Sequence, residues 1–198
     1  MNATNELNTL IIRNIEDLDV AAKHIAEIED QIWKLITDEA ERWLRARGWN
    51  IGPDASEIWF GRPDWVQEDG ATFIGWFYFD KGPDDTNSSA PGEPHFWLSR
   101  YLGRAGGELC LWFGQDVAKG KAWRTVVRTF ADELTKAGAR ISDAGNIFIP
   151  CSLSATAVAE GYSNNDFKEA LAPITSALDL AEALSPVLQL ALDKAREA

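Results

Sequence analysis

The sequence predicts an α+β fold, in which an antiparallel, aromatic-rich sheet of four to five strands forms a meander beside a long N-terminal helix and C-terminal helices. Three observations support this class. Apolar residues recur at helical spacing over the first quarter of the 198-residue chain, aromatic-rich runs separated by turn signals follow, and helical spacing returns in the last quarter. We expect residues 1–198 to form a single globular domain, because no linker or internal repeat divides the chain.

The first predicted element is one long helix over residues 15–47. Its apolar face is formed by Leu18, Ala21, Ile25, Ile28, Ile32, Leu35, Ile36 and Trp43, which are spaced as on one side of a helix. Asn14 is the expected N-cap and Gly48 the expected stop, while Thr37 offers an alternative start for a second helix. Glu41 precedes Arg45 by one helical turn, and such pairs of acid before base are typical of a solvent-exposed face.

Residues 57–113 are predicted to form the meander. The expected strands are residues 57–61, 72–80, 95–102 and 108–113, which are short and rich in β-forming residues. Turn-forming glycines precede the second and the fourth run. In the second run, one face is formed by Phe73, Phe77 and Phe79 and the other by Ile74, Trp76 and Tyr78. A strand that is apolar on both faces is normally covered on both.

The chain then returns to helical patterns. We expect a helix over residues 121–137, a fifth strand over 147–151 and helices over 165–197. Pro173 and Pro186 are expected to divide the last segment, with Ser185 and Pro186 as the cap and first turn of a new helix. Residues 81–94 form the longest stretch without a predicted element, and loops of that length are usually functional or disordered.

Composition excludes some classes of function. The formal charge is −12 and the pI near 4.6, which argues against binding nucleic acid through general phosphate contacts. The first residues do not resemble a signal peptide and no apolar stretch is long enough to span a membrane, so we expect a cytoplasmic protein. Cys110 and Cys151 lie in apolar runs and are interpreted as buried small hydrophobes. We expect no cofactor.

Candidate catalytic residues are few. The two histidines, His24 and His95, and two separated cysteines do not form a transition-metal pattern, so no metal site is predicted. Glycine-rich phosphate loops and a nucleophile elbow are absent from the sequence. The best remaining constellation is Asp80, His95 and Glu108 at the ends of the predicted strands, where they would suit acid–base chemistry if the meander brought them together. Ordinary solvated strand ends explain the same residues.

Acidic residues with fewer basic neighbours than those of the first helix gather in two predicted loops. The candidate partner-binding residues are Asp64, Trp65, Glu68 and Asp69 in the first loop, and Asp84, Asp85 and Glu93 in the second. Acidic loops of this kind accelerate association with a basic partner, and they also keep an apolar protein soluble. Trp65 is the expected exposed anchor. Opposite charge is predicted on one helix face, where Lys121, Arg124 and Arg128 form a basic patch.

These patterns favour a non-enzymatic, acidic protein-binding module as the first hypothesis. We expect an inhibitor or immunity-type protein that blocks a basic, nucleic-acid-binding surface of its target. The second hypothesis is a small enzyme with its site at Asp80, His95 and Glu108. The third is a homodimeric structural subunit that pairs through the N-terminal helix.

Overall fold

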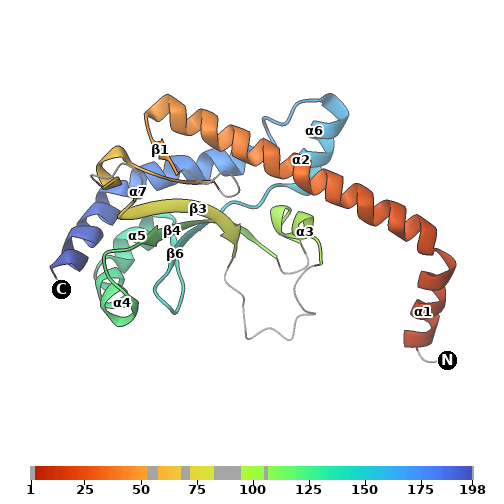
Figure 1. The fold of residues 1–198 in the computed structure, drawn as a ribbon, viewed down its shortest axis with the longest axis horizontal. Coiled ribbons are helices and arrows are strands. Elements are labelled where there is room, and N and C mark those ends of the chain that lie inside the picture. Colours follow the sequence, from red (N-terminus) through yellow and green to blue (C-terminus); the bar gives the residue numbers. More distant parts are fainter. Residues whose placement is uncertain (1–2, 53–57, 68–71, 83–94, 105–106, 198) are drawn as a thin grey trace.

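A computed structural model describes residues 3–52, 58–67, 72–82, 95–104 and 107–197, and confirms the α+β class. The strands are β1 (Asn50–Ile51), β2 (Trp59–Gly61), β3 (Gly75–Lys81), β4 (Leu109–Gln115), β5 (Arg140–Ile141) and β6 (Ile147–Pro150). The helices are α1 (Ala3–Arg13), α2 (Ile15–Arg47), α3 (Trp97–Tyr101), α4 (Gly120–Thr129), α5 (Ala131–Ala137), α6 (Ala155–Asn164) and α7 (Ala172–Arg196), with a 3₁₀ turn at Pro63–Trp65. All pairs among these strands are antiparallel, in the order β1-β2-β3-β4-β6-β5. Figure 1 shows the long helix α2 and the helix α7 beside the strands β3 and β4.

The predicted third strand, residues 95–102, is wrong, because this segment contains the helix α3. β3 therefore pairs directly with β4, with Tyr78 opposite Trp112. The aromatic run has Trp97 and Tyr101 four residues apart, and such short apolar runs fit a helix turn as well as a strand. A side chain from α2 stabilises the helix, since Glu29 Oε1 accepts a hydrogen bond from the Leu98 backbone N–H at 2.7 Å.

The predicted helix over residues 15–47 is confirmed as α2, without a break at Thr37. Gly48 ends it in the left-handed conformation at φ +69°, which glycine adopts without a steric penalty. Asn14 precedes α2, but its side chain donates backward to the Leu10 carbonyl and makes no capping bond to α2. No helix in the described ranges combines the length and the apolar composition that crossing a bilayer requires.

Other helix boundaries also differ from the prediction, and α1 and α6 lie outside the predicted helix ranges. The expected helix over 121–137 is two helices, α4 and α5, which meet at Phe130. Pro186 does not divide the C-terminal segment but lies inside α7, whereas Pro173 falls in the first turn of that helix. The packing of α7 in the core outweighs the hydrogen bond that Pro186 removes, because Leu184 and Leu188 on either side are fully buried.

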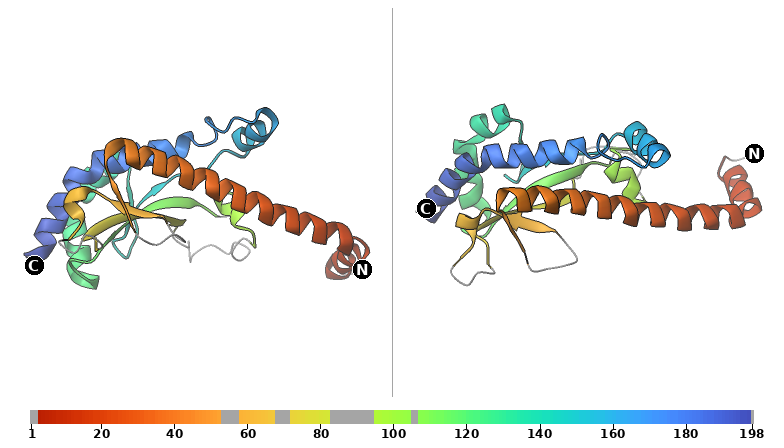
Figure 2. Two further views of the ribbon diagram at one scale, coloured as in Figure 1. Left: turned by 45° about the horizontal axis from the view of Figure 1, so that its top comes forward. Right: turned by 90° about the horizontal axis from the view of Figure 1, so that it is seen from above.

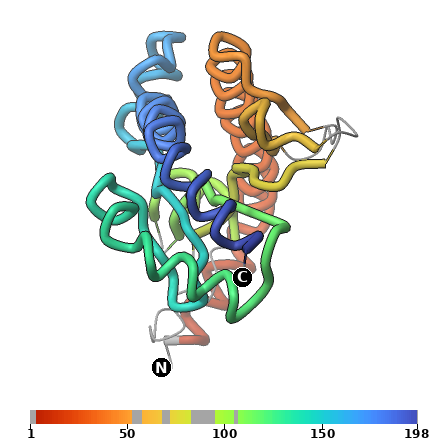
Figure 3. The backbone as a smooth tube through the Cα atoms, turned by 90° about the vertical axis from the view of Figure 1, so that its left-hand side faces the viewer, coloured from red at the N-terminus to blue at the C-terminus, as the bar shows by residue number. Residues whose placement is uncertain are grey.

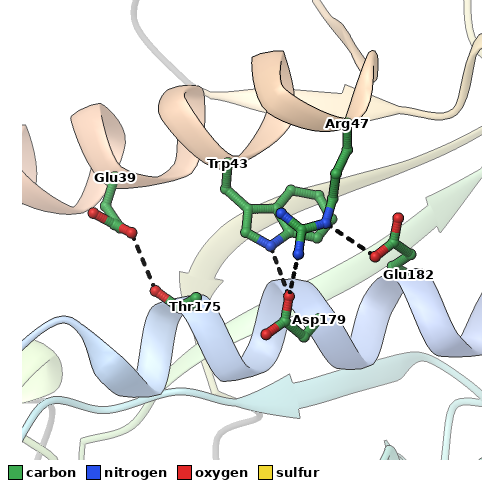
Figure 4. Close-up of polar contacts among 6 residues, drawn as sticks. All are labelled: Glu39, Trp43, Arg47, Thr175, Asp179 and Glu182. Carbon is green, nitrogen blue, oxygen red and sulfur yellow. Dashed lines mark hydrogen bonds and ion pairs between the residues drawn. The ribbon is translucent and has the colours of Figure 1, made fainter.

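Helices α2 and α7 lie side by side over one face of the sheet, as Figure 3 shows in end view. Polar contacts along this helix pair are drawn in Figure 4. The Trp43 indole N–H donates to Asp179 Oδ1 at 2.8 Å, and the Arg47 guanidinium bonds both Asp179 and Glu182 at 3.0 Å. One helical turn before Trp43, the Glu39 carboxylate accepts a hydrogen bond from the Thr175 hydroxyl at 3.2 Å. These contacts fix how α7 covers the sheet.

The first half of α2 does not cover the sheet. Together with α1 it extends away from the rest of the molecule, and we call residues 3–27 the N-terminal arm (Figure 2). The expectation that the whole apolar face of this helix is core is therefore wrong for its first half. Leu18 is 45% exposed, whereas Ile32 and Ile36 are buried against the core. At about 1.5 Å per residue, the 33 residues of α2 span about 50 Å, which exceeds what the sheet covers.

Candidate functional site: an aromatic groove on the open face of the sheet

A groove runs over the face of the sheet opposite α2 and α7. It has a volume of about 860 Å³, and its aromatic lining includes Trp59, Trp76, Tyr78 and Trp112. These side chains come from three neighbouring strands and are half-buried. The cause is the alternation of β3, in which Phe77 and neighbouring odd-numbered positions face the core while the even-numbered positions face the groove. The described chain thus leaves an aromatic surface on this face of the sheet.

Two glycines allow the indole rings to lie close against the backbone. A Cβ atom added at Gly114, which pairs with Trp76 across the strands, would lie 2.5 Å from Trp76 Cε2. A Cβ atom at Gly52 would lie 2.2 Å from Trp59 Cε2. Real Cβ atoms do not approach other heavy atoms so closely, so these ring positions require glycine. The rings of Trp59 and Trp76 are held against the backbone by this arrangement.

The ring of Trp112 is also fixed. Its indole N–H donates to the Lys81 carbonyl at 2.8 Å, and its ring lies 4.8 Å from that of Phe148. A rigid aromatic surface binds a ligand with a lower entropy cost than a mobile one.

Phe73 also lines the groove, which contradicts the predicted alternation. The sequence pattern placed Phe73 on the same face as Phe77, but Phe73 packs against Trp59 with a centroid distance of 5.1 Å, and Ile74 enters the core instead. The physical reason is a bend at Ile74, immediately before β3 begins at Gly75, which changes the phase of the alternation.

Polar side chains lie among the aromatic ones. Asp80, Lys81, Gln115, Asp116 and Asn146 line the groove. Gln115 has a structural role, because its Oε1 accepts from the backbone N–H groups of Val117 and Ala118 at 2.8 and 2.9 Å. The groove therefore combines aromatic faces with two carboxylates and one ammonium group.

A second hollow, of about 330 Å³, adjoins the groove between α2, α3 and the ends of β3 and β4. We call it the acidic pocket. Its lining includes Glu29, Asp30, Trp33, Trp97 and Tyr101. Tyr78 and Asp80 line both hollows, so the two sites are contiguous along β3.

The predicted catalytic trio is not gathered around either hollow. Asp80 lines both, whereas His95 and Glu108 are absent from the linings of the two. His95 is exposed with its ring 4.8 Å from that of Phe96, and Glu108 forms an ion pair with Arg140 at 3.3 Å. The expectation depended on a strand beginning at His95, and the helix α3 removes that geometry.

The predicted anchor Trp65 is fully buried, so its expected exposure is wrong. The 3₁₀ turn at Pro63–Trp65 directs its indole inward, where the N–H donates to Gln189 of α7 at 2.7 Å. Asp64 stays at the surface in a two-bond contact with Arg62, and this hydrogen-bonded guanidinium lowers the pKa of Asp64. The other predicted partner-binding residues, Glu68, Asp69, Asp84, Asp85 and Glu93, lie outside the described residues.

The basic patch lies where its helical spacing places it. Lys121, Arg124 and Arg128 are exposed on α4. Arg124 Nε donates to the Ala144 carbonyl at 3.4 Å.

Both cysteines are buried and unpaired, as the apolar runs around them predict. Burial, with a smaller contribution from the nearby Glu108 carboxylate, raises the pKa of Cys110 to about 12. Burial likewise raises the pKa of Cys151. Within the described ranges, no three His, Cys, Asp or Glu side chains are arranged to hold a metal ion.

The groove is the feature that sequence reasoning missed, although a signal was present. Trp76 and Tyr78 occupy alternate positions of one run, and Gly114 follows Trp112 by two residues in another. Glycine at the centre of a strand often marks a close approach by another group. Comparisons with protein-family models, curated proteins and solved structures find no match to this chain.

Proposed function

We propose that this chain is a non-enzymatic binding module that holds a basic segment of a partner protein on the open face of its sheet. The observation that carries the proposal is the aromatic groove with carboxylates among its rings and the acidic pocket beside it. The function is of the inhibitor or immunity type, in which the acidic module occupies a basic, nucleic-acid-binding surface of its target.

Aromatic faces and carboxylates together favour a cationic ligand. The face of an indole ring attracts lysine and arginine side chains through its quadrupole, and the attraction increases as the cation is desolvated. Asp80 and Asp116 add opposite charge at the groove, against the single ammonium of Lys81. The net charge of −12 contributes a long-range attraction that raises the association rate with a basic partner. The same charge repels the phosphates of free nucleic acid.

A short peptide of alternating arginine and glycine tests this proposal, with a peptide of alternating glutamate and glycine as the control ligand. Fluorescence anisotropy should show saturable binding of the basic peptide that weakens as salt increases. Removing one ring by Trp76→Ala or Trp112→Ala should raise Kd by about two- to tenfold, the range expected for one aromatic contact.

Tyr162→Ala is the matched control variant, because Tyr162 is a 41% exposed aromatic residue on α6, and α6 contributes no residue to the groove lining. It should leave Kd unchanged. Equal binding of both peptides, or equal Kd for wild type and Trp76→Ala, would contradict the proposal. The inhibitor role has a further test, in which the wild-type chain should release a DNA fragment from an arginine-rich protein that it binds, and Trp76→Ala should do so less well.

A second candidate function, a homodimeric subunit, is favoured by the N-terminal arm. Seven large apolar side chains of the arm are between 41% and 73% exposed: Leu7, Leu10, Ile11, Ile12, Ile15, Leu18 and Val20. Exposed apolar surface of this extent usually marks an interaction site. Leu7, Ile11, Asn14, Leu18, Ala21, Ile25 and Ile28 follow one another at alternating steps of four and three residues. Within α2, Leu18, Ala21 and Ile25 keep the heptad spacing of a coiled-coil seam, and the turn at Asn14 separates them from Leu7 and Ile11 of α1.

Light scattering during size-exclusion chromatography tests the dimer. The wild-type chain should elute with about twice its mass of 21.9 kDa, and Leu18→Glu on the seam should reduce it to a monomer. Val20→Glu is the matched control, because Val20 is 69% exposed but lies off the seam. A monomeric wild type at high concentration, or equal effects of the two variants, would contradict this candidate.

A further inference from the structure

The acidic pocket has an aromatic side built from two helices. Trp33 of α2 and Tyr101 of α3 have nearly parallel rings, at 14° with centroids 6.0 Å apart, and Trp97 lies at 34° to Tyr101 at the same distance. Trp33 is fixed from behind, since its ring meets that of Phe79 edge-on at 6.5 Å. Trp97, at 44% exposed, is accessible to a ligand. Trp33 and Tyr101 are therefore stacked, whereas Trp97 is tilted against Tyr101. A flat aromatic face such as that of Trp97 suits a planar group better than a spherical one.

Three carboxylates complete the pocket. Glu29 Oε1 accepts from the Leu98 N–H and Asp80 Oδ1 from the Lys81 N–H, each at 2.7 Å. These backbone bonds orient the two carboxylates and leave the second oxygen of each without a hydrogen bond from the described residues. The carboxylate of Asp30 is exposed and makes neither a hydrogen bond nor an ion pair with the described part of the chain. The pocket therefore offers oriented acceptors to a donor that enters it.

The negative field of these carboxylates acts on a neighbouring group. Burial raises the pKa of Tyr101 to about 12, and the charges of Glu29 and Asp30 contribute to that increase. A cation in the pocket is favoured by the same field. Within the protein, the guanidinium carbon of Arg100 lies 5.3 Å from the centroid of the Trp97 ring, so this ring already contacts one guanidinium group.

We propose that the acidic pocket binds the guanidinium group of an arginine side chain from the partner. This proposal rests on the proposed function and names the group that the partner must supply. A guanidinium is planar, weakly hydrated and able to stack on aromatic rings while donating two hydrogen bonds to one carboxylate. A lysine ammonium is not planar and cannot stack on a flat aromatic face, and it is more strongly hydrated.

N-acetyl-arginine amide and N-acetyl-lysine amide are the probes, titrated separately into the full chain and followed by the indole N–H resonances. The arginine probe should bind saturably and at least about threefold more tightly than the lysine probe, since stacking adds to charge attraction. Trp97→Ala and Asp30→Asn should each weaken its binding by about three- to tenfold. Trp97→Phe should restore most of the affinity lost in Trp97→Ala, because it returns an aromatic face.

Tyr162→Ala again serves as the control, because Tyr162 is exposed on α6 and lines neither the groove nor the acidic pocket. It should leave the affinity for the arginine probe unchanged. Equal affinity for the two probes, or an unchanged Kd in Asp30→Asn, would overturn the assignment. The two proposals fail separately: a wild-type chain that binds the basic peptide but not the arginine probe refutes the pocket alone. A chain that binds the arginine probe but not the peptide refutes the proposed function.

Discussion

The hydrogen bond between Trp43 and Asp179 should contribute measurably to the stability of the pair α2 and α7. Trp43 is 4% exposed, and its indole N–H has Asp179 Oδ1 as acceptor at 2.8 Å. Asp179→Ala leaves this donor buried without an acceptor, which costs about 1–3 kcal/mol. The ion pair with Arg47 adds at most about 1 kcal/mol, because the Asp179 side chain is 53% exposed. We expect the free energy of unfolding to fall by about 2–3 kcal/mol.

Urea denaturation at constant pH measures this difference. Glu182→Ala is the matched control, since it removes the other acidic partner of Arg47 but no acceptor of Trp43, and it should cost less than about 1 kcal/mol. Asp179→Asn, which keeps an acceptor oxygen, should cost less than Asp179→Ala. In a Trp43→Phe background, which has no indole N–H, Asp179→Ala should lose most of its effect. Equal costs for Asp179→Ala in both backgrounds would refute the reasoning.

Three further predictions concern the core and the groove. Because folding raises the pKa of Cys110 to about 12, its stabilising contribution is complete below the unfolded thiol pKa of about 8.5 and is lost as pH rises toward 12. The native chain should therefore react with a thiol reagent at pH 8 far more slowly than the denatured chain, and equal rates would contradict burial. Gly114→Ala should lower the free energy of unfolding by about 1–3 kcal/mol, because its Cβ atom forces the Trp76 ring away. The loss should be smaller in a Trp76→Ala background, and additive losses would exclude this contact. Pro186→Ala should raise the free energy of unfolding by about 1–3 kcal/mol, because alanine restores the helical hydrogen bond; a decrease would mean that α7 needs the distortion at Pro186.

Helix α2 was predictable because its signals are local. The spacing of its apolar residues defines a helix, and Gly48 ends it through its own backbone conformation. The spacing does not show which part of the protein, if any, each turn of the helix packs against. Ile32 and Leu18 occupy equivalent positions of one stripe, yet one packs in the core and the other lies on the arm. Burial depends on where the rest of the chain folds, and that information is not local.

The same limit explains the errors around the site. Trp65 stands between acidic residues in the sequence, so its exposure was a reasonable expectation, but a single 3₁₀ turn rotates the ring toward α7. Trp97 shows the reverse, since it lies in an aromatic run and is nevertheless exposed. Of the carboxylates at the candidate site, Asp80 was a candidate in the sequence, whereas Glu29 and Asp116 were not. The location of the aromatic surface depended on which face of the sheet α2 and α7 cover.

The indole N–H resonances of the nine tryptophans give the most direct test of the claim that the open face of the sheet, with the acidic pocket beside it, binds a basic segment. They would be assigned by single Trp→Phe variants and followed during titration with the arginine–glycine peptide. We expect the resonances of Trp59, Trp76 and Trp112 in the groove, and of Trp33 and Trp97 in the pocket, to shift with one common Kd. The buried Trp43 and Trp65 should not move. Shifts confined to other tryptophans, or none at all at saturating peptide, would contradict the claim.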